Sequence, residues 1–219
     1  MKTVKFQQPI YYILLLILIL NVSVNGQEKL EISRLSNNIN FDGRFDEDAW
    51  KEIQPLPLIM LMPDYGGVPS EETIVKIAYN DDYLYVGARL FDSQSDRMKS
   101  QLKRDDWKYS CDWLTIILDT FNDKENTVVF ATSPSGLRTD VAFSIDVSDL
   151  MRDMNLSWNT FWDVKTIIDD KGWNAEIRIP FSSLRFQEEN SKVVMGLCIS
   201  RYIPRKYEAY VFPKTDLKH

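Results

Sequence analysis

The stretch "TIVKIAYNDDYLYVGARLFD", residues 73–92, decides the fold. Apolar and polar residues alternate on both sides of its central "NDD", and this period of two is typical of strands with one buried and one wet face. Asparagine and aspartate tolerate positive φ angles and bond their own backbone, so the "NDD" predicts a hairpin turn. The stretch therefore predicts two antiparallel strands, at 73–79 and 83–91.

The same alternation recurs along the chain, separated by turn-forming segments such as "FNDKEN" and "DDKG". The predicted strands are 73–79, 83–91, 112–119, 127–132, 136–143, 161–168, 172–179 and 193–201. Helical signals are confined to 46–53, with Asp46 as a plausible N-cap, and to a short turn after Pro180, which also ends the preceding strand. Eight strands need two sheets or a barrel. We predict an all-β fold, a two-sheet antiparallel β-sandwich of jelly-roll or immunoglobulin-like type with one or two short helices, in preference to a closed barrel.

The first 26 residues have the pattern of a secretory signal peptide. Lys2 and Lys5 precede the apolar run 10–20, and the small residues of "VNG" follow it. A membrane anchor is the alternative, but this run is shorter than the ~20 residues that a spanning helix needs. We therefore predict a signal peptide at 1–26 and one domain at 27–219. The protein is expected to be exported, and so periplasmic, outer-membrane-associated or extracellular.

Composition argues against several classes of function. The formal net charge of −6 falls to −8 once residues 1–26, with two lysines and no acidic residue, are removed. An acidic chain is a poor partner for nucleic acid, because affinity there comes from neutralising phosphates. His219 is the single histidine and the last residue, so Ser-His-Asp hydrolysis and HExxH zinc sites lack their central group. Cys111 and Cys198 could form one disulfide or remain as small buried apolar residues.

Four segments, in order along the chain, resemble the hallmark segments of family 9 carbohydrate-binding modules. They are "INFDGRFDEDAW" (39–50), "YNDDYLYVGARLFD" (79–92), "DWLTIILDTFND" (112–123) and "GWNAEIRIPFSSLRF" (172–186). The chain looks most like the variant at the N-terminus of exported Bacteroidetes-type proteins, over about residues 39–210. The resemblance implies a β-sandwich that binds sugars and is attached to glycan-degrading enzymes, with structural calcium in some members. In that variant a C-terminal region, thought to form an outer-membrane-associated barrel, follows; here an outer-membrane-associated partner or a missing C-terminal region is expected instead.

Sugar recognition needs a flat aromatic ring for the apolar face of the sugar and polar groups for its hydroxyl edge. Trp107 and Tyr109 lie among charged residues, with Arg104 and Asp106 just before them. In the family that this chain resembles, the platform tryptophan precedes the strand that starts here at Asp112, and spacing allows either Trp107 or Tyr109. The alternative is that Trp107 only packs over the end of the sandwich.

A second platform lies near the C-terminus in the family that the chain resembles. Tyr210 or Phe212 could fill that role, but both could equally be ordinary strand residues. Trp158 lies on the longest stretch without strand periodicity, 144–158, and could line a groove. The remaining tryptophans considered are assigned to the core: Trp50, Trp162 and Trp173.

These features predict a non-catalytic carbohydrate-binding module that takes a polysaccharide or oligosaccharide and serves polysaccharide catabolism. Two departures weaken this prediction, because Thr115 and Ala131 stand where the resembled family has a polar contact and an arginine. The alternative is a structural or interaction domain of the cell envelope that has lost sugar binding. A glycoside hydrolase is less favoured, since it needs two carboxylates about 5–10 Å apart across a cleft, for which Asp105, Asp106 and Asp112 are available.

Sugar binding of this kind requires no cofactor, but structural calcium is a second expectation. Calcium prefers six to eight oxygen ligands from carboxylates and carbonyls. Two acidic groups could supply a site, although solvated turns are the default interpretation. They are Asp42, Asp46, Glu47 and Asp48 in the first group, and Asp119, Asn122 and Asp123 in the second.

Overall fold

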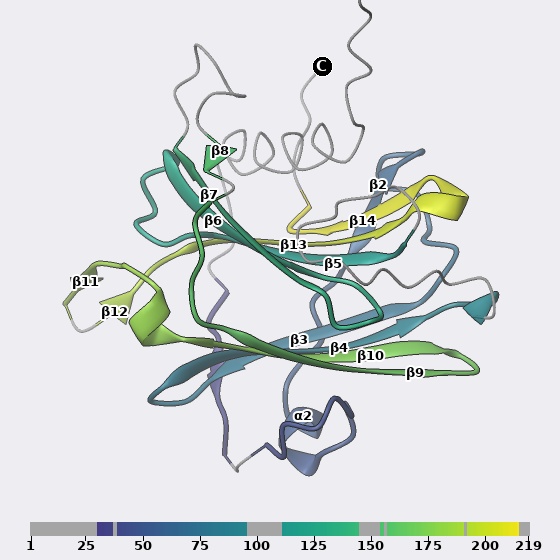
Figure 1. Ribbon diagram of the computed structural model, residues 1–219, viewed down its shortest axis with the longest axis horizontal. Helices are drawn as coiled ribbons and strands as arrows, with labels where there is room; N and C mark the ends of the chain where they lie inside the picture. Colours follow the sequence, from purple (N-terminus) through teal and green to yellow (C-terminus); the bar gives the residue numbers. More distant parts are fainter. Residues whose placement is uncertain are drawn as a thin grey trace, which may run out of the picture.

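Two stacked β-sheets make up the protein, as the computed structural model shows (Figure 1). The structure describes residues 30–36, 39–95, 111–144, 154–155, 157–190 and 192–214. One sheet has five strands in the order β1-β3-β4-β10-β9, and the other has seven in the order β2-β14-β13-β5-β6-β7-β8. All pairings within the two sheets are antiparallel except that of β1 with β3.

The strands of the five-stranded sheet are β1 (Ser33–Arg34), β3 (Thr73–Tyr79), β4 (Tyr83–Phe91), β10 (Gly172–Pro180) and β9 (Asp163–Asp169). Those of the seven-stranded sheet are β2 (Ile59–Met62), β14 (Glu208–Phe212), β13 (Gly196–Ile203), β5 (Trp113–Asp119), β6 (Asn126–Thr132), β7 (Arg138–Ser144) and β8 (Met154–Asn155). The other elements are the hairpin β11 (Glu188–Glu189) and β12 (Lys192–Val193), the helix α2 (Asp48–Lys51), and the 3-10 turns η2 (Phe181–Ser183) and η3 (Pro204–Lys206).

The predicted all-β sandwich is confirmed, and each of the eight predicted strands is present with its ends displaced by a few residues at most. Pro180 ends β10 and η2 follows it, as predicted. The helix prediction was wrong in detail, because α2 is one turn long, its N-cap is Glu47, and no side chain caps it. The packing of Ala49 and Trp50, both buried, stabilises this turn in place of the predicted Asp46 cap.

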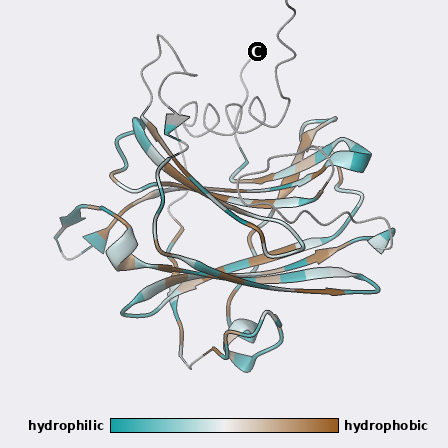
Figure 2. Cartoon of the chain, viewed as in Figure 1, coloured by the Kyte–Doolittle hydropathy of each residue, from teal (hydrophilic) through white to brown (hydrophobic). Residues whose placement is uncertain are grey.

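The main core lies between the two sheets. In β4 the even-numbered residues point inward, from Leu84 to Leu90, and they meet the inward side chains of β5 and β10. Trp162 and Trp173 are buried in this layer, as predicted. Figure 2 shows the hydrophobic residues concentrated along the strands, with hydrophilic residues over α2 and many of the turns.

The outer face of the five-stranded sheet carries the segment that contains α2 (Figure 1). Gly87 of β4 leaves the space that this segment fills, because a Cβ there would lie 2.4 Å from the Phe45 ring and 2.8 Å from the Trp50 ring. Trp50 is therefore a core residue, as predicted, but it belongs to a separate cluster with Ile53 and Ala78 rather than to the main core.

The seven-stranded sheet differs from the prediction of one buried and one wet face. All seven residues of β5 are buried. The side of this sheet that faces away from the main core carries a second apolar cluster. Its buried members are Leu61, Ile117, Val129, Val141, Phe143, Cys198, Ala209 and Val211. The alternation predicted the strand at 112–119 but not the burial of both of its faces, because apolar residues occur on both.

The two cysteines are both buried, and they do not form a disulfide. Cys198 stands opposite Ile117 in the β5–β13 pair, whereas Cys111 precedes β5. Six residues of extended chain separate Cys111 from Ile117, about 20 Å. This separation excludes the disulfide considered from the sequence, since a bridge needs Cα atoms within about 7 Å. Among the described residues, none of the helices has the length and apolar character to cross a membrane.

Candidate functional site

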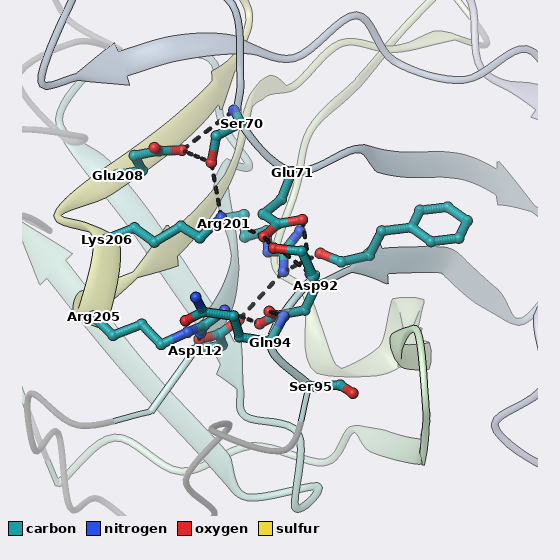
Figure 3. Close-up of polar contacts among 12 residues, drawn as sticks. Ser70, Glu71, Asp92, Gln94, Ser95, Asp112, Arg201, Arg205, Lys206 and Glu208 are labelled. Atoms are coloured by element: carbon teal, nitrogen blue, oxygen red, sulfur yellow. Dashed lines mark hydrogen bonds and ion pairs between the residues drawn. The ribbon is translucent and has the colours of Figure 1, made fainter.

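The predicted platform residues Trp107, Tyr109, Arg104 and Asp106 lie outside the described residues. The connection that carries them runs from the end of β4 to the start of β5, so its two stems are described. Both stems lie at one end of the sandwich, together with the β13–β14 turn. We call this the polar end, because buried and half-buried charged residues fill it (Figure 3).

The two other predicted ring positions are described. Trp158 is half-buried and packs edge-on against the ring of Phe130, with 6.0 Å between ring centroids. Tyr210 has no exposed surface, and its hydroxyl lies within the polar end, where it accepts a hydrogen bond from the backbone N–H of Glu71 at 3.1 Å. The Tyr210 ring therefore offers no face to a sugar, and its interpretation as an ordinary strand residue fits its position in β14.

Arg201 is the central residue of the polar end. It lies on β13 of the seven-stranded sheet, and its side chain is fully buried between the sheets. Its guanidinium donates to the carbonyl oxygens of Glu72 and Phe91 and to Thr73 Oγ1, all on or beside strands of the five-stranded sheet, at 3.3, 2.8 and 2.9 Å. It also pairs with Asp112 at 3.3 Å. One side chain thus joins the two layers at this end.

Arg205 lies in η3, the turn between β13 and β14, and contacts both stems of the β4–β5 connection. Its Nη1 donates to Asp112 Oδ1 at 3.1 Å, and its Nη2 donates to Asp92 Oδ2. Asp92 directly follows β4 and Asp112 directly precedes β5, and both are about 2% exposed. Figure 3 shows Arg205 and Asp112 close together below Asp92.

Burial dominates the ionisation of this cluster. It raises the pKa of Asp112, although Arg201 and Arg205 oppose the shift, and it lowers the pKa of Arg201 despite the nearby Asp112. Both shifts disfavour the charged forms. The Arg201–Asp112 pair therefore satisfies groups that folding has buried, rather than adding much net stability of its own.

The rim of the polar end is more accessible. Lys206 pairs with Glu71, and Glu208 accepts a hydrogen bond from Ser70 Oγ at 2.8 Å. Between these two residues stands Tyr207, whose ring is 71% exposed and whose φ of 54° lies in the left-handed region. A non-glycine residue in this conformation is uncommon and is found preferentially at functional sites. The turn therefore presents an aromatic ring with fixed charged groups on both sides.

Asp112, considered from the sequence as a glycosidase carboxylate, is unsuited to that role in this arrangement. It is 2% exposed and both of its oxygens accept hydrogen bonds from guanidinium groups. Asp105 and Asp106 lie outside the described residues. Thr115 and Ala131, the two departures from the family pattern, are almost fully buried.

A separate acidic group lies where the α2 segment meets β10. Carboxylate oxygens of Asp42, Glu47 and Glu176 lie within 4.8 Å of one another, which makes this the candidate metal group among the described residues. Asp42 and Glu47 belong to the predicted acidic cluster, and the structure adds Glu176. The donor set is all oxygen, which suits calcium. Glu47 Oε2 is buried without a hydrogen-bond partner, but Glu176 already accepts bonds from the backbone N–H groups of Asp42 and Gly43 and from Trp50 Nε1.

The second predicted calcium group is engaged differently. The two carboxylate oxygens of Asp119 accept hydrogen bonds from the backbone N–H groups of Asp123 and Lys124. Asp123 in turn accepts from the N–H groups of Glu125 and Asn126. These carboxylates therefore accept hydrogen bonds from the backbone of the β5–β6 turn, in which Asn122 and Lys124 have positive φ. The turn thus already occupies oxygen atoms that a calcium ion would need.

Glu176 makes stability depend on pH. Burial raises its pKa from 4.5 to about 7. A carboxyl group whose folded-state pKa is raised stabilises the fold below its unfolded pKa, and this contribution is lost as pH rises through the folded value. We therefore expect the free energy of unfolding, measured with a chelator present, to fall by about 2 kcal/mol from pH 5 to pH 8.

Glu176→Gln is the control for this pH dependence, because an amide does not ionise. Its unfolding free energy should change much less over the same range. Carboxyl groups with lowered pKa, such as Glu71, complete their titration at lower pH. Equal slopes for the two proteins in urea titrations at each pH would contradict the assignment to Glu176.

Several of these residues were not predicted from the sequence. Arg201 was placed at the end of a strand without a role, and Arg205 and Tyr207 were not considered. A signal existed in "RYIPRKYE", residues 201–208, where three basic residues surround a proline between two apolar strands. The role of Glu176 was not predicted, because an acidic residue in an alternating strand is normally assigned to the solvent-facing side.

The two stacked, mainly antiparallel sheets place the chain in the class of β-sandwich domains. The family model described as "Carbohydrate family 9 binding domain-like" matches residues 41–202, and the chain belongs to that family. This confirms the resemblance drawn from the sequence. No curated protein matches the chain in sequence.

Solved structures share the fold. A family 9 carbohydrate-binding module from Caldicellulosiruptor kristjanssonii, in complex with glucose, superposes with a TM-score of 0.56 at 18% identity, over 82% of this chain and 83% of that one. The complex with cellotriose gives 0.52 at 17% identity, over 82% and 80%. A Bacteroides uniformis ATCC 8492 protein, for which carbohydrate binding is itself only proposed, gives 0.62 at 10% identity, over 83% and 87%.

Proposed function

We propose that the chain binds carbohydrate at the polar end. The observation that carries this proposal is Tyr207, a 71% exposed ring held between Lys206 and Glu208 on a turn with a left-handed residue. Trp107 or Tyr109, on the β4–β5 connection whose stems lie at the same end, would supply a second ring. Arg104 and Asp106 would then contact hydroxyl groups beside it.

The chemistry of the polar end suits a sugar. The exposed ring can stack on the apolar C–H face of a pyranose, and the fixed polar groups can bond its hydroxyls. Ser70 and Gln94 add a hydroxyl and an amide to the exposed rim. A stacked ring contributes ~1 kcal/mol beyond its buried area, so we expect modest affinity. Membership of the family and the glucose and cellotriose complexes of its structural neighbours support the same class of ligand.

The wider role that we propose is that of a non-catalytic module in an exported protein, periplasmic, outer-membrane-associated or extracellular, that serves polysaccharide catabolism. An outer-membrane-associated partner or a further region of a longer protein would place it at the cell envelope. Binding as proposed requires no cofactor. Calcium bound by Asp42, Glu47 and Glu176 would have a structural role alone: its positive charge would hold the α2 segment against β10.

A second candidate function is a structural or interaction domain that has lost sugar binding. The observation in its favour is the burial of Thr115 and Ala131, at 1% and 0% exposure, where the family pattern has polar contacts. Only the first function requires the protein to bind a soluble sugar, so a measurement of sugar binding distinguishes the two.

The test is calorimetric titration of the wild type with glucose and cellotriose, supported by a glycan array. Tyr207→Ala and Trp107→Ala should each weaken binding about fivefold, as the loss of ~1 kcal/mol implies. Phe161→Ala is the matched control, since this ring is 79% exposed but precedes β9 away from the polar end. Absence of binding by the wild type to any glycan would favour the second candidate. Equal affinity of all four proteins would place the binding site elsewhere.

A further inference from the structure

Tyr210 of β14 carries a hydroxyl group that the proposed function does not use. Its ring is fully buried and packs with Met60 and Ile203. Its hydroxyl accepts a hydrogen bond from the backbone N–H of Glu71 at 3.1 Å and donates one to the carboxylate of Glu208. One buried hydroxyl therefore links the segment that precedes β3 to the first residue of β14.

The two residues that flank Tyr207 are both bonded to the neighbouring pair Ser70 and Glu71. On one side, Glu208 Oε2 accepts from Ser70 Oγ at 2.8 Å and from the Ser70 N–H at 3.4 Å, in addition to the tyrosine hydroxyl. On the other side, Lys206 Nζ bonds the Glu71 carboxylate and donates to Ser70 Oγ at 3.1 Å. Figure 3 shows Glu208 and Lys206 both extending toward Ser70. The turn is thus fastened on both sides of the exposed ring.

Tyr207 requires such support because of its backbone conformation. Its φ of 54° lies in the left-handed region, which residues other than glycine rarely adopt. A conformation of this kind persists only where the surrounding contacts determine it. The turn itself contributes the hydrogen bond from the Tyr207 N–H to the carbonyl oxygen of Pro204 at 3.2 Å. The contacts that fasten its two neighbours therefore help to hold the ring in its exposed position.

The hydrogen bond between Tyr210 and Glu208 is a charge-assisted one. Burial alone would raise the pKa of Glu208, but hydrogen bonds from Tyr210 and Ser70 outweigh burial and hold this pKa below its usual value. Glu208 is therefore ionised at neutral pH. Hydrogen bonds to an ionised acceptor are roughly twice as strong as those between neutral groups. Removal of the Tyr210 hydroxyl should therefore loosen the attachment of Glu208 more than loss of a neutral contact would.

We propose that Tyr210 is a positioning residue that holds the Tyr207 ring in place through Glu208. Sugar affinity depends on the Tyr210 hydroxyl for this reason, without contact between Tyr210 and the sugar. Only this dependence of affinity rests on the proposed function. Tyr210 has no exposed surface, so its substitution removes no direct contact with a ligand. Tyr210 thus tests positioning separately from Glu208, which lies at the accessible rim.

The first measurement is amide hydrogen exchange by NMR in Tyr210→Phe, which keeps the buried ring and removes only the hydroxyl. The exchange rate of the Tyr207 N–H should rise about threefold or more, because its turn opens more often. Amides of β4 and β10 should stay within about twofold of the wild type. A purely structural role would raise exchange throughout the sandwich in step with the loss of stability.

The same sample gives a second signature at Glu208. Its carboxyl pKa, followed by NMR, should be higher in Tyr210→Phe than in the wild type, because a donor to the ionised form is lost. Ser70→Ala removes another donor to Glu208 at an exposed position, so it tests the same route without a change in the core. It should also raise exchange at Tyr207, and unchanged exchange in this variant would overturn the route through Glu208.

The matched control is Tyr85→Phe. It removes a tyrosine hydroxyl that accepts a hydrogen bond from Asn80 at 3.4 Å, near the start of β4 and so at the far end of that strand from Asp92. Exchange at Tyr207 should stay within about twofold of the wild type in this control. Unchanged exchange at Tyr207 in Tyr210→Phe, or an equal increase in Tyr85→Phe, would overturn the proposal.

The second measurement is titration with cellotriose. Tyr210→Phe should lose about threefold in affinity, less than removal of the Tyr207 ring, and Tyr85→Phe should lose none. The double variant Tyr207→Ala, Tyr210→Phe should bind no more weakly than Tyr207→Ala, because the hydroxyl acts through that ring. A further loss in the double variant would overturn the positioning role. Raised exchange with unchanged affinity in Tyr210→Phe would overturn the dependence of binding on Tyr210.

Failure of the proposed function has a different result. A wild type that binds no glycan would refute sugar binding, and the exchange measurement would still decide whether Tyr210 holds Tyr207 in place.

Discussion

Replacing Arg201 with alanine is expected to lower the free energy of unfolding by about 3–5 kcal/mol, the range found when one partner of a buried pair is removed. The variant leaves Asp112 paired with Arg205, and it removes the guanidinium that donates to the Phe91 carbonyl oxygen and to Thr73 Oγ1. The carbonyl oxygen of Glu72 keeps the backbone N–H of Phe91 at 3.0 Å. A buried acceptor that loses its donor costs about 1–3 kcal/mol, and this cost is one part of the expected loss. Urea titration followed by tryptophan fluorescence measures it.

The control for this variant is Arg34→Ala. Arg34 also pairs with an aspartate, Asp81, but the two side chains are 52% and 80% exposed. Water solvates the remaining carboxylate, so we expect no resolvable change in the urea midpoint. Similar losses in the two variants would show that Arg201 acts as a surface charge rather than as the link between the sheets.

Replacing Gly87 with valine is expected to cost about 2–3 kcal/mol by overpacking the outer face of the five-stranded sheet. The new Cβ would lie 2.4 Å from a carbon of the Phe45 ring and 2.8 Å from one of the Trp50 ring, far below van der Waals contact. Both rings must move, and Trp50 then loses its bond to Glu176 at 3.3 Å. Differential scanning calorimetry should show a lower melting temperature, and the fluorescence of Trp50 should indicate exposure to water.

A second substitution tests the mechanism of this loss. Phe45→Ala in the Gly87→Ala background removes the closer of the two contacts. The double variant should be more stable than the sum of the separate losses implies, since the two positions are in direct contact. Strict additivity would show that the glycine is required for its backbone rather than for the space that the rings occupy.

The strands of the sandwich were predictable from the sequence because successive residues of a strand with one buried face alternate between apolar and polar. β3 and β4 are the clearest examples. The α2 helix was predicted too long, since one turn held by Trp50 carries little helical periodicity. The strand at 112–119 was predicted, but the burial of the outer face of β5 was not, because the apolar cluster on that face combines residues of several strands that lie far apart in the sequence.

The candidate site was predicted only in outline. The sequence pointed to the β4–β5 connection, and the structure shows that its stems lie beside the β13–β14 turn. Tyr207 and Arg205 lie on that turn nearly a hundred residues further along the chain. Tyr210 was a candidate ring that the structure buries, since its position in β14 packs it against Met60 and Ile203.

The sequence by itself determined the class of fold and the family, because alternation and turn residues are local properties that each segment carries alone. Only the tertiary structure decided which charges meet. Asp92, Asp112 and Arg205 are distant in sequence and come together where two sheets end. No local sequence pattern predicts these contacts. Their pairing follows from strand order and register, which depend on the packing of the whole sandwich.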